Sequence, residues 1–236
     1  MNTEEPFDIV YTWVDNSDQQ YKRIQDSFKQ EWLQTHSWDE EIVGEMRDRN
    51  NDELKYSLRS VEKFAPWVNH IFLVTFNQYP EWLNLNHPKL KLVQHKDILP
   101  NSFLPTFNSF AMEWALYRIL GLSENFIYFN DDYFLGQPVL PQNFYSPEQG
   151  HLLSFAFDLG DRVSHKNNKT NPWRASMVNA NMHLEERFGK RVRWAQLHLP
   201  HFFRKSIFEE MATVFAHSAQ QTMSHKFRGY NRLVPK

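Results

Sequence analysis

Apolar runs and helically spaced apolar positions alternate along the chain. Continuous or alternating apolar stretches predict β-strands at residues 7–14, 70–75, 89–95 and 126–129. Apolar residues recurring every three or four positions predict helices at 19–35, 53–63 and 108–120, with two more near 176–188 and 204–218. This order of strands and helices is typical of an α/β domain with a mostly parallel sheet.

The pattern becomes irregular after residue 136. Prolines interrupt the stretch 137–175, and its polar part, 161–171, is expected to form a mobile loop of functional importance. The chain therefore divides into an α/β core and a more irregular, helical C-terminal part.

Composition narrows the class of protein. A chain of 236 residues that is 41% hydrophobic can bury the core of one large domain. The net charge of −2 argues against a general nucleic-acid binder, because such domains are usually strongly basic. The absence of cysteine excludes a disulfide framework and a Cys-ligated zinc site.

The N-terminal residues are acidic and lack the features of a signal peptide. No stretch reaches the roughly 18 apolar residues that a membrane-spanning helix needs. The sequence therefore predicts a cytoplasmic protein, with peripheral contact at the inner face of the plasma membrane as a further expectation.

Carboxylates follow two of the predicted strands. Asp15 comes after the first strand, and Asn130, Asp131 and Asp132 come after the strand at 126–129. Ligands of open α/β sheets bind beyond the carboxyl ends of the strands, and paired carboxylates there suit Mg²⁺ or Mn²⁺ bridged to a phosphate. The alternative is a turn that caps a helix.

A second cluster combines histidines with cations. His198 and His201 flank a rigid Leu-Pro pair, and Arg204 and Lys205 follow. Histidine is suited to proton transfer near neutral pH, and the two cations are candidates for binding phosphate oxygens of the substrate. The alternative is an ordinary loop histidine beside a solvated basic helix face.

A third cluster lies near the C-terminus, where Lys226, Arg228 and Arg232 surround Tyr230. Cations interleaved with an aromatic ring can bind a nucleotide, although an exposed basic tail is the alternative. No glycine-rich phosphate loop is present, and the chain has only 7 glycines. Any phosphate is therefore expected to be held by a metal and by cationic side chains.

Taken together, these motifs resemble the Stealth family of sugar-phosphate transferases. That family includes bacterial capsular polysaccharide phosphotransferases and the animal enzyme that adds N-acetylglucosamine-1-phosphate to lysosomal glycoproteins. The similar segments occur in the family's order along nearly the whole chain. They are Asp8–Asp15, Glu53–Trp67, Leu104–Ser109, Phe126–Asp132, and His198–His201 continuing to Arg228.

The resemblance implies a GT-A-like α/β fold, in which a nucleotide-sugar-binding sheet is flanked by helices. It also implies an enzyme that transfers a sugar-1-phosphate from a nucleotide-sugar, commonly a UDP-sugar, to a hydroxyl of a polysaccharide or glycan acceptor. A phosphodiester forms and the nucleoside monophosphate leaves, usually with the help of a divalent cation such as Mg²⁺ or Mn²⁺. The expected setting is the synthesis of capsular polysaccharide or exopolysaccharide.

Roles for individual residues follow from the resemblance. The expected catalytic residues are Asp132, His198 and Arg228. The expected metal ligands are Asp131, Asp132 and Asp15. The expected substrate-binding residues are Tyr11, Trp13 and Asn108, together with Arg204 and Lys205 from the second cluster.

The resemblance predicts one transferase domain over residues 1–236. Its α/β core would occupy 7–136, and residues 137–236 would complete the site. The chain is expected to lack a fourth, short Asp-containing region of the family. A truncated, inactive relative that binds a nucleotide-sugar or a glycan is therefore one alternative. An ordinary glycosyltransferase on the same fold is another.

Overall fold

A computed structural model describes residues 5–44, 49–152, 172–191 and 197–230. A five-stranded sheet at its centre has the strand order β3-β2-β1-β4-β7. The strands are β1 (Phe7–Thr12), β2 (Ile71–Thr75), β3 (Leu90–Gln94), β4 (Asn125–Asn130) and β7 (His201–Arg204), while β5 (Tyr145–Ser146) and β6 (Gly150–His151) form a separate ribbon. The helices are α1 (Gln19–Leu33), α2 (Glu40–Val43), α3 (Glu53–Phe64), α4 (His95–Ile98), α5 (Ser109–Ala115), α6 (Pro172–Phe188), α7 (Lys205–Val214) and α8 (Ala216–Ser224).

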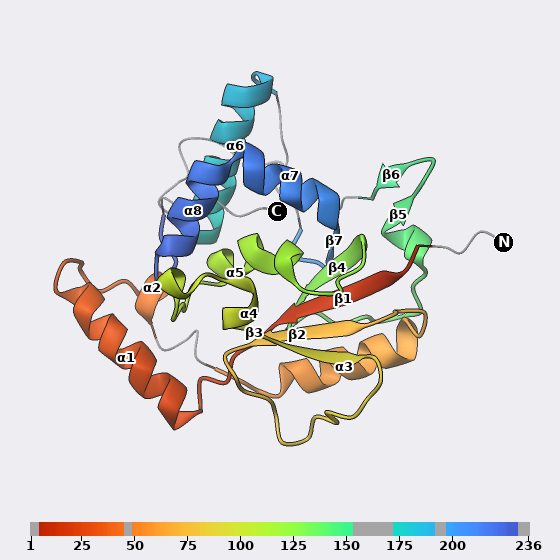
Figure 1. Cartoon of the computed structure of the whole chain (residues 1–236), viewed down its shortest axis with the longest axis horizontal. Helices are drawn as coiled ribbons and strands as arrows, with labels where there is room; N and C mark the ends of the chain where they lie inside the picture. The colour runs from red at the N-terminus through yellow and green to blue at the C-terminus, as the bar shows by residue number, and fades with distance from the viewer. Residues whose placement is uncertain (1–4, 45–48, 153–171, 192–196, 231–236) are drawn as a thin grey trace.

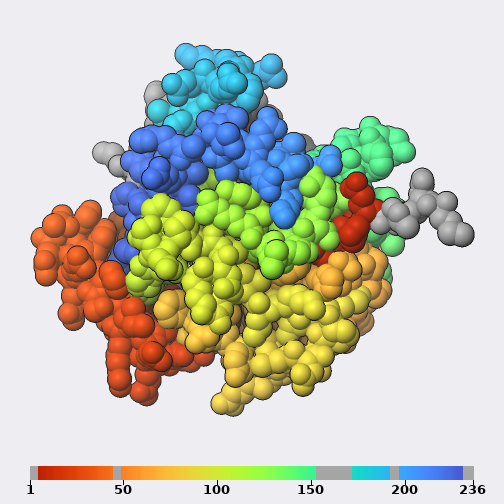
Figure 2. Space-filling view, viewed as in Figure 1, coloured from red at the N-terminus to blue at the C-terminus, as the bar shows by residue number. Residues whose placement is uncertain are grey.

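The first four strands of the sheet run parallel, and β7 runs antiparallel to β4. In the central pair, Thr12 of β1 lies opposite Asn130 of β4, so both strands end at the same edge. Helix α3 covers one face of the sheet, while α5, α7 and α8 cover the other (Figure 1). Helix α8 packs against α5, and α7 packs against the 3-10 turn Leu116–Arg118 that follows α5. In Figure 2 the blue C-terminal helices lie beside these green segments at the surface.

Both faces of the sheet are buried because the side chains of its strands alternate between two apolar clusters. On β1, Val10 packs into the cluster that contains residues of α5, α7 and α8. Its neighbours Ile9 and Tyr11 pack into the cluster on the α3 side. A strand buried on both faces has a nearly continuous apolar sequence, which explains the run Ile9-Val10-Tyr11.

The structure confirms the predicted α/β class and the mostly parallel sheet, in an arrangement consistent with a GT-A-like fold. All four predicted strands and the helices at 19–35 and 53–63 are present, with ends shifted by one or two residues. The predicted helix at 108–120 is α5 followed by a short 3-10 turn, Leu116–Arg118. The predicted mobile loop at 161–171 lies outside the described residues.

The helix predicted near 204–218 is present as two consecutive helices, α7 and α8, which are separated at Phe215 and preceded by the unpredicted strand β7. Phe202 packs on the α3 side of the sheet and Phe203 packs against the opposite cluster. Adjacent side chains can reach opposite faces only in an extended strand. Among the described helices, none has the length and apolarity required to cross a membrane.

Asp8 joins three segments at the start of the parallel strands. Its buried carboxylate accepts hydrogen bonds from the Asn69 side chain and the His70 backbone at Oδ1, at 2.9 and 3.0 Å. Its Oδ2 accepts a third bond from the Ser123 backbone N–H at 2.7 Å. One side chain therefore ties β1 to the segments that lead into β2 and β4.

We predict that Asp8→Ala lowers the free energy of unfolding by about 2–4 kcal/mol, because it leaves buried donors without an acceptor. Urea unfolding followed by circular dichroism measures the change. Glu62→Ala, which removes an exposed carboxylate on α3, is the control and should change stability by less than about 0.5 kcal/mol. Equal stability of the two variants would contradict the role given to Asp8.

Candidate active site

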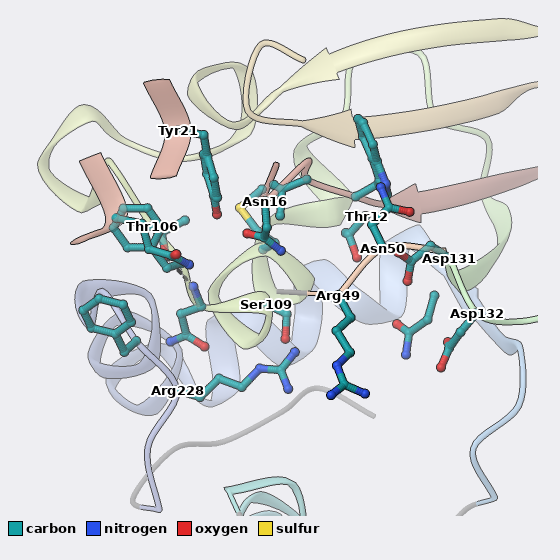
Figure 3. A pocket seen from close by; sticks show the side chains of 18 of the residues that line it. Thr12, Asn16, Tyr21, Arg49, Asn50, Thr106, Ser109, Asp131, Asp132 and Arg228 are labelled. Atoms are coloured by element: carbon teal, nitrogen blue, oxygen red, sulfur yellow. Dashed lines mark hydrogen bonds between the residues drawn. The ribbon is translucent and has the colours of Figure 1, made fainter. Parts of the chain in front are cut away.

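A cleft of about 450 Å³ opens at the carboxyl edge of the parallel strands. It is lined by side chains from β1, α1, α3, β4 and α5. His198, Phe227 and Arg228 from the C-terminal part complete the lining. Figure 3 shows Asp131 and Asp132 on one side and Tyr21 and Thr106 on the other. The guanidinium groups of Arg49 and Arg228 lie between these two sides (Figure 3).

The carboxylates of Asp131 and Asp132 follow β4 directly, as the sequence predicted. Burial, together with the charges of Asp132 and Glu53, raises the pKa of Asp131 to about 6. The sequence analysis missed Glu53, which lies at the start of α3 and lines the same cleft. The electrostatic coupling of these three carboxylates gives this side of the cleft a negative charge.

The imidazole of His198 lies between two partners at this acidic side. Its Nδ1 is 3.1 Å from the hydroxyl of Tyr133, and its Nε2 is 3.5 Å from Oδ2 of Asp132. Burial raises the pKa of Tyr133, so its hydroxyl stays protonated. In the tautomer that carries hydrogen on Nδ1, the lone pair of Nε2 faces Asp132 and the cleft.

The antiparallel direction of β7 explains why His198 reaches the cleft and the nearby cations do not. His201 pairs with Tyr128 near the end of β4, whereas Arg204 pairs with Asn125 at its start. Arg204 donates from Nε to Glu124 at 3.1 Å, on the opposite edge of the sheet. Neither Arg204 nor Lys205 lines the cleft, so the structure does not support their predicted role in substrate binding.

Arg228 is distant in sequence but enters the cleft because its segment is bound to the loop before α5. Asn108 donates from Nδ2 to the carbonyls of Thr222 and His225, each at 3.2 Å. The backbone N–H of Phe107 donates to the carbonyl of Lys226 at 2.8 Å. Asn108 lines the cleft as predicted, but its contacts make it a positioning residue for the C-terminal segment.

Two further residues predicted for the site, Tyr11 and Asp15, do not line the cleft, whereas Trp13 does. Tyr11 is fully buried and its hydroxyl bonds to Ser57 at 2.7 Å, because its position on β1 faces α3. Asp15 lines a neighbouring hollow, where its Oδ1 accepts bonds from the backbone and hydroxyl of Ser17. Trp13 lines both the cleft and that hollow.

The carboxylates of the cleft can supply one or two ligands to a divalent cation, but not a complete set. In the part of the chain that the structure describes, no three His, Asp or Glu side chains form a ready-made metal cluster, so the predicted set of Asp131, Asp132 and Asp15 is not assembled. Asp131 and Asp132 nevertheless follow one another at the end of β4 and line the same cleft, and burial together with the charge of Asp132 raises the pKa of Asp131. A protein contribution of one or two carboxylates is what Mg²⁺ uses when substrate phosphates supply other ligands.

Comparison with known proteins identifies the fold family. Residues 47–153 match Stealth protein CR2, conserved region 2, and residues 197–231 match Stealth protein CR3, conserved region 3. An exopolysaccharide phosphotransferase of Lactiplantibacillus plantarum is 33% identical over 98% of this chain and 74% of its own length. The chain belongs to the Stealth family.

Two further relatives carry related names. An exopolysaccharide phosphotransferase of Streptomyces coelicolor is 41% identical over 94% of this chain and 36% of its own length. A capsular polysaccharide phosphotransferase of Haemophilus influenzae is 35% identical over 99% of this chain and 64% of its own length. The present Stealth chain thus spans less than two thirds of these two proteins.

Both matched Stealth regions supply walls of the cleft. The second region carries Glu53, Asp131 and Asp132, and the third carries His198 and Arg228. The sequence analysis missed Arg49 in addition to Glu53, and both lie around the polar turn before α3. That polar turn was the available signal, since polar residues clustered beside a helix start often belong to a site.

We predict that Asn108→Ala detaches the C-terminal segment and lowers the free energy of unfolding by about 2–3 kcal/mol, since it removes a helix cap and two interior bonds. The backbone amide of Phe107 should exchange with deuterium faster in this variant. Asn101→Ala, at an exposed position nearby, is the matched control. Unchanged exchange at Phe107 would contradict this role of Asn108.

Proposed function

We propose that this protein transfers a sugar-1-phosphate from a nucleotide-sugar to a hydroxyl group of a polysaccharide acceptor, and so forms a phosphodiester. The observation that carries the proposal is one cleft that gathers Asp131, Asp132, His198 and Arg228. Relatives named capsular or exopolysaccharide phosphotransferases support the reaction class. A UDP-sugar is the proposed donor, and capsule or exopolysaccharide synthesis the proposed setting.

In the proposed reaction, an acceptor hydroxyl attacks the phosphorus that carries the sugar. A P–O bond to the acceptor forms, and the P–O bond to the nucleoside monophosphate breaks. Nε2 of His198 takes the proton of the hydroxyl, and the nearby Asp132 carboxylate then stabilises the imidazolium. The tyrosine hydroxyl at Nδ1 keeps the ring oriented.

Charge neutralisation is the second requirement, since phosphoryl transfer depends mainly on positioning and electrostatics. Arg228 and Arg49 extend into the middle of the cleft, where the phosphates of a bound donor would lie (Figure 3). Asp131 and Asp132 are the proposed ligands of Mg²⁺ or Mn²⁺. Such an ion, when bound, neutralises negative charge on phosphate oxygens.

The released nucleotide tests the reaction. With Mg²⁺, UDP-sugars and capsule-type acceptors, the product expected is UMP, whereas an ordinary glycosyltransferase would release UDP. Asp132→Asn and His198→Ala should each lower kcat by about 100-fold to 10,000-fold, because proton transfer and charge stabilisation contribute on that scale. Chromatography of the nucleotides measures both.

Release of UDP in this assay would replace the proposal with glycosyl transfer. Donor binding by a folded protein without release of either nucleotide would favour a binding role. His201→Ala is a matched control for His198→Ala, since His201 does not line the cleft. It should retain activity within a few-fold of the wild-type protein.

A second prediction compares Arg228 and Arg204, to both of which the sequence assigned a role in the site. Arg228→Lys should lower kcat by about 100-fold, because a lysine cannot reproduce the planar, multidentate contact of a guanidinium with phosphate. Arg204→Lys should leave kcat nearly unchanged, since this residue pairs with Glu124 outside the cleft. Steady-state kinetics on both purified variants decides the matter, and equal losses would argue against the cleft as the phosphate site.

A further inference from the structure

Four buried polar atoms of residues that line the cleft have no hydrogen-bond partner. They are Asn16 Oδ1, Gln25 Oε1, His95 Nδ1 and Ser109 Oγ, and all four residues line the cleft. Buried polar groups are nearly always paired in native proteins, because an unpaired one loses its hydration without replacement. Such a concentration in one cavity indicates that a bound molecule supplies the partners.

The two most enclosed of these groups belong to side chains at one end of the cleft. Gln25 is 7% exposed and His95 is 5% exposed. Gln25 lies one turn after Tyr21 on α1, and therefore on the same helix face. His95 contacts Phe76, which in turn contacts Tyr21, with ring centroids 5.8 and 5.1 Å apart.

Aromatic rings complete this end of the cleft. The ring of Phe107 lies 5.6 Å from that of Tyr21 and 5.3 Å from that of Phe227, and all three residues line the cleft. Aromatic faces of this kind are the surfaces on which nucleobases stack. We call Tyr21, Gln25, His95, Phe107 and Phe227 the aromatic end.

The hydrogen-bonding groups of the aromatic end are neutral. Burial lowers the pKa of His95 to about 4, so its ring is uncharged near pH 7. The amide oxygen of Gln25 accepts hydrogen bonds, and Nδ1 of His95 accepts one when the hydrogen is on Nε2. The one-turn neighbour of Gln25 on α1, Lys29, also lines the cleft, but it already interacts with another residue and is not counted among the acceptors. A matching ligand group is planar, uncharged and equipped with N–H donors.

We propose that the aromatic end binds the nucleobase of the donor, with N–H groups of the base donating to Gln25 and His95. This assignment rests on the proposed function. It places the base at one side and the phosphate attached to the nucleoside between Arg49 and Arg228 (Figure 3). The phosphate attached to the sugar then lies near Asp132 and His198. A nucleotide-sugar has its base, phosphates and sugar in that same order.

The experiment compares nucleotides with a ligand that lacks the base. Titration calorimetry measures the binding of UMP, CMP, AMP, GMP and ribose 5-phosphate to the whole protein. At least one nucleotide should bind about tenfold or more tightly than ribose 5-phosphate. Gln25→Met keeps the size of the side chain and should lower that preference about tenfold, since one hydrogen bond is lost, while the Kd of ribose 5-phosphate stays unchanged.

Two further variants make the test specific. Gln30→Met introduces the same change at an exposed position of α1 and should leave every Kd unchanged. His95→Phe removes the other proposed acceptor, which belongs to α4, and remains informative if Gln25→Met does not fold. The Tm of ligand-free Gln25→Met should equal or exceed that of the wild-type protein, because the substitution removes an unpaired buried oxygen.

The assignment is overturned if no nucleotide binds better than ribose 5-phosphate, or if Gln25→Met and His95→Phe both keep the wild-type preference. Equal weakening of nucleotide and ribose 5-phosphate also overturns it, because the loss would then not concern the base. If UMP release and phosphodiester formation are observed while the preference is unaffected, only this assignment fails. If the preference behaves as expected and no sugar phosphate is transferred, the proposed function fails and the base site stands.

Discussion

The parallel pairing of β1 with β4 is the constraint on which the site depends. Thr12 and Asn130 lie opposite each other, so the residues after both strands emerge at one edge of the sheet. The backbone hydrogen bonds of such a pair are buried under helices on both faces and cannot be exchanged for water. Asp8 strengthens the arrangement at the other end of the same strands, through three hydrogen bonds to segments that precede β2 and β4.

A second group of contacts brings the C-terminal part of the chain to this edge. The backbone bond from Phe107 to Lys226 and the side-chain bonds of Asn108 join segments more than one hundred residues apart. The ammonium group of Lys226 adds bonds to the carbonyls of Phe103 and Leu104, at 3.2 and 3.0 Å. The position of Arg228 in the middle of the cleft therefore depends on the loop before α5, where the sequence predicted that Asn108 would bind the substrate.

Charge is distributed along the cleft in a way that suits a long, partly charged ligand. The acidic side carries the group with a raised pKa, Asp131, and the histidine beside Asp132. The middle is cationic, and the far side is aromatic and neutral. The acidic side holds carboxylates that repel one another, and the aromatic side holds buried polar atoms without partners. Such locally unfavourable groups are common at binding sites.

The sequence by itself determined the fold class, the positions of the central strands and the acidic residues at the end of β4. These depend on local causes, because apolar runs predict buried strands and the residues after a strand must emerge at its end. The placement of Arg204, Arg228, Tyr11 and Asp15 depended on the tertiary structure. β7 reverses direction and moves Arg204 to the opposite edge, while Asn108 fixes Arg228 in the cleft.

Tyr11 and Asp15 show the same limit at shorter range. The sheet face on which Tyr11 is buried, and the local turn that occupies the carboxylate of Asp15, both depend on packing rather than on residue type. Gln25 and His95 lie in no motif, and Glu53 begins a family-like segment that assigned it no role; the significance of all three arises from the groups that surround them in the cleft. Residue type and spacing indicate what chemistry a chain can perform, but burial and direction decide which groups meet, because these are properties of the packed molecule.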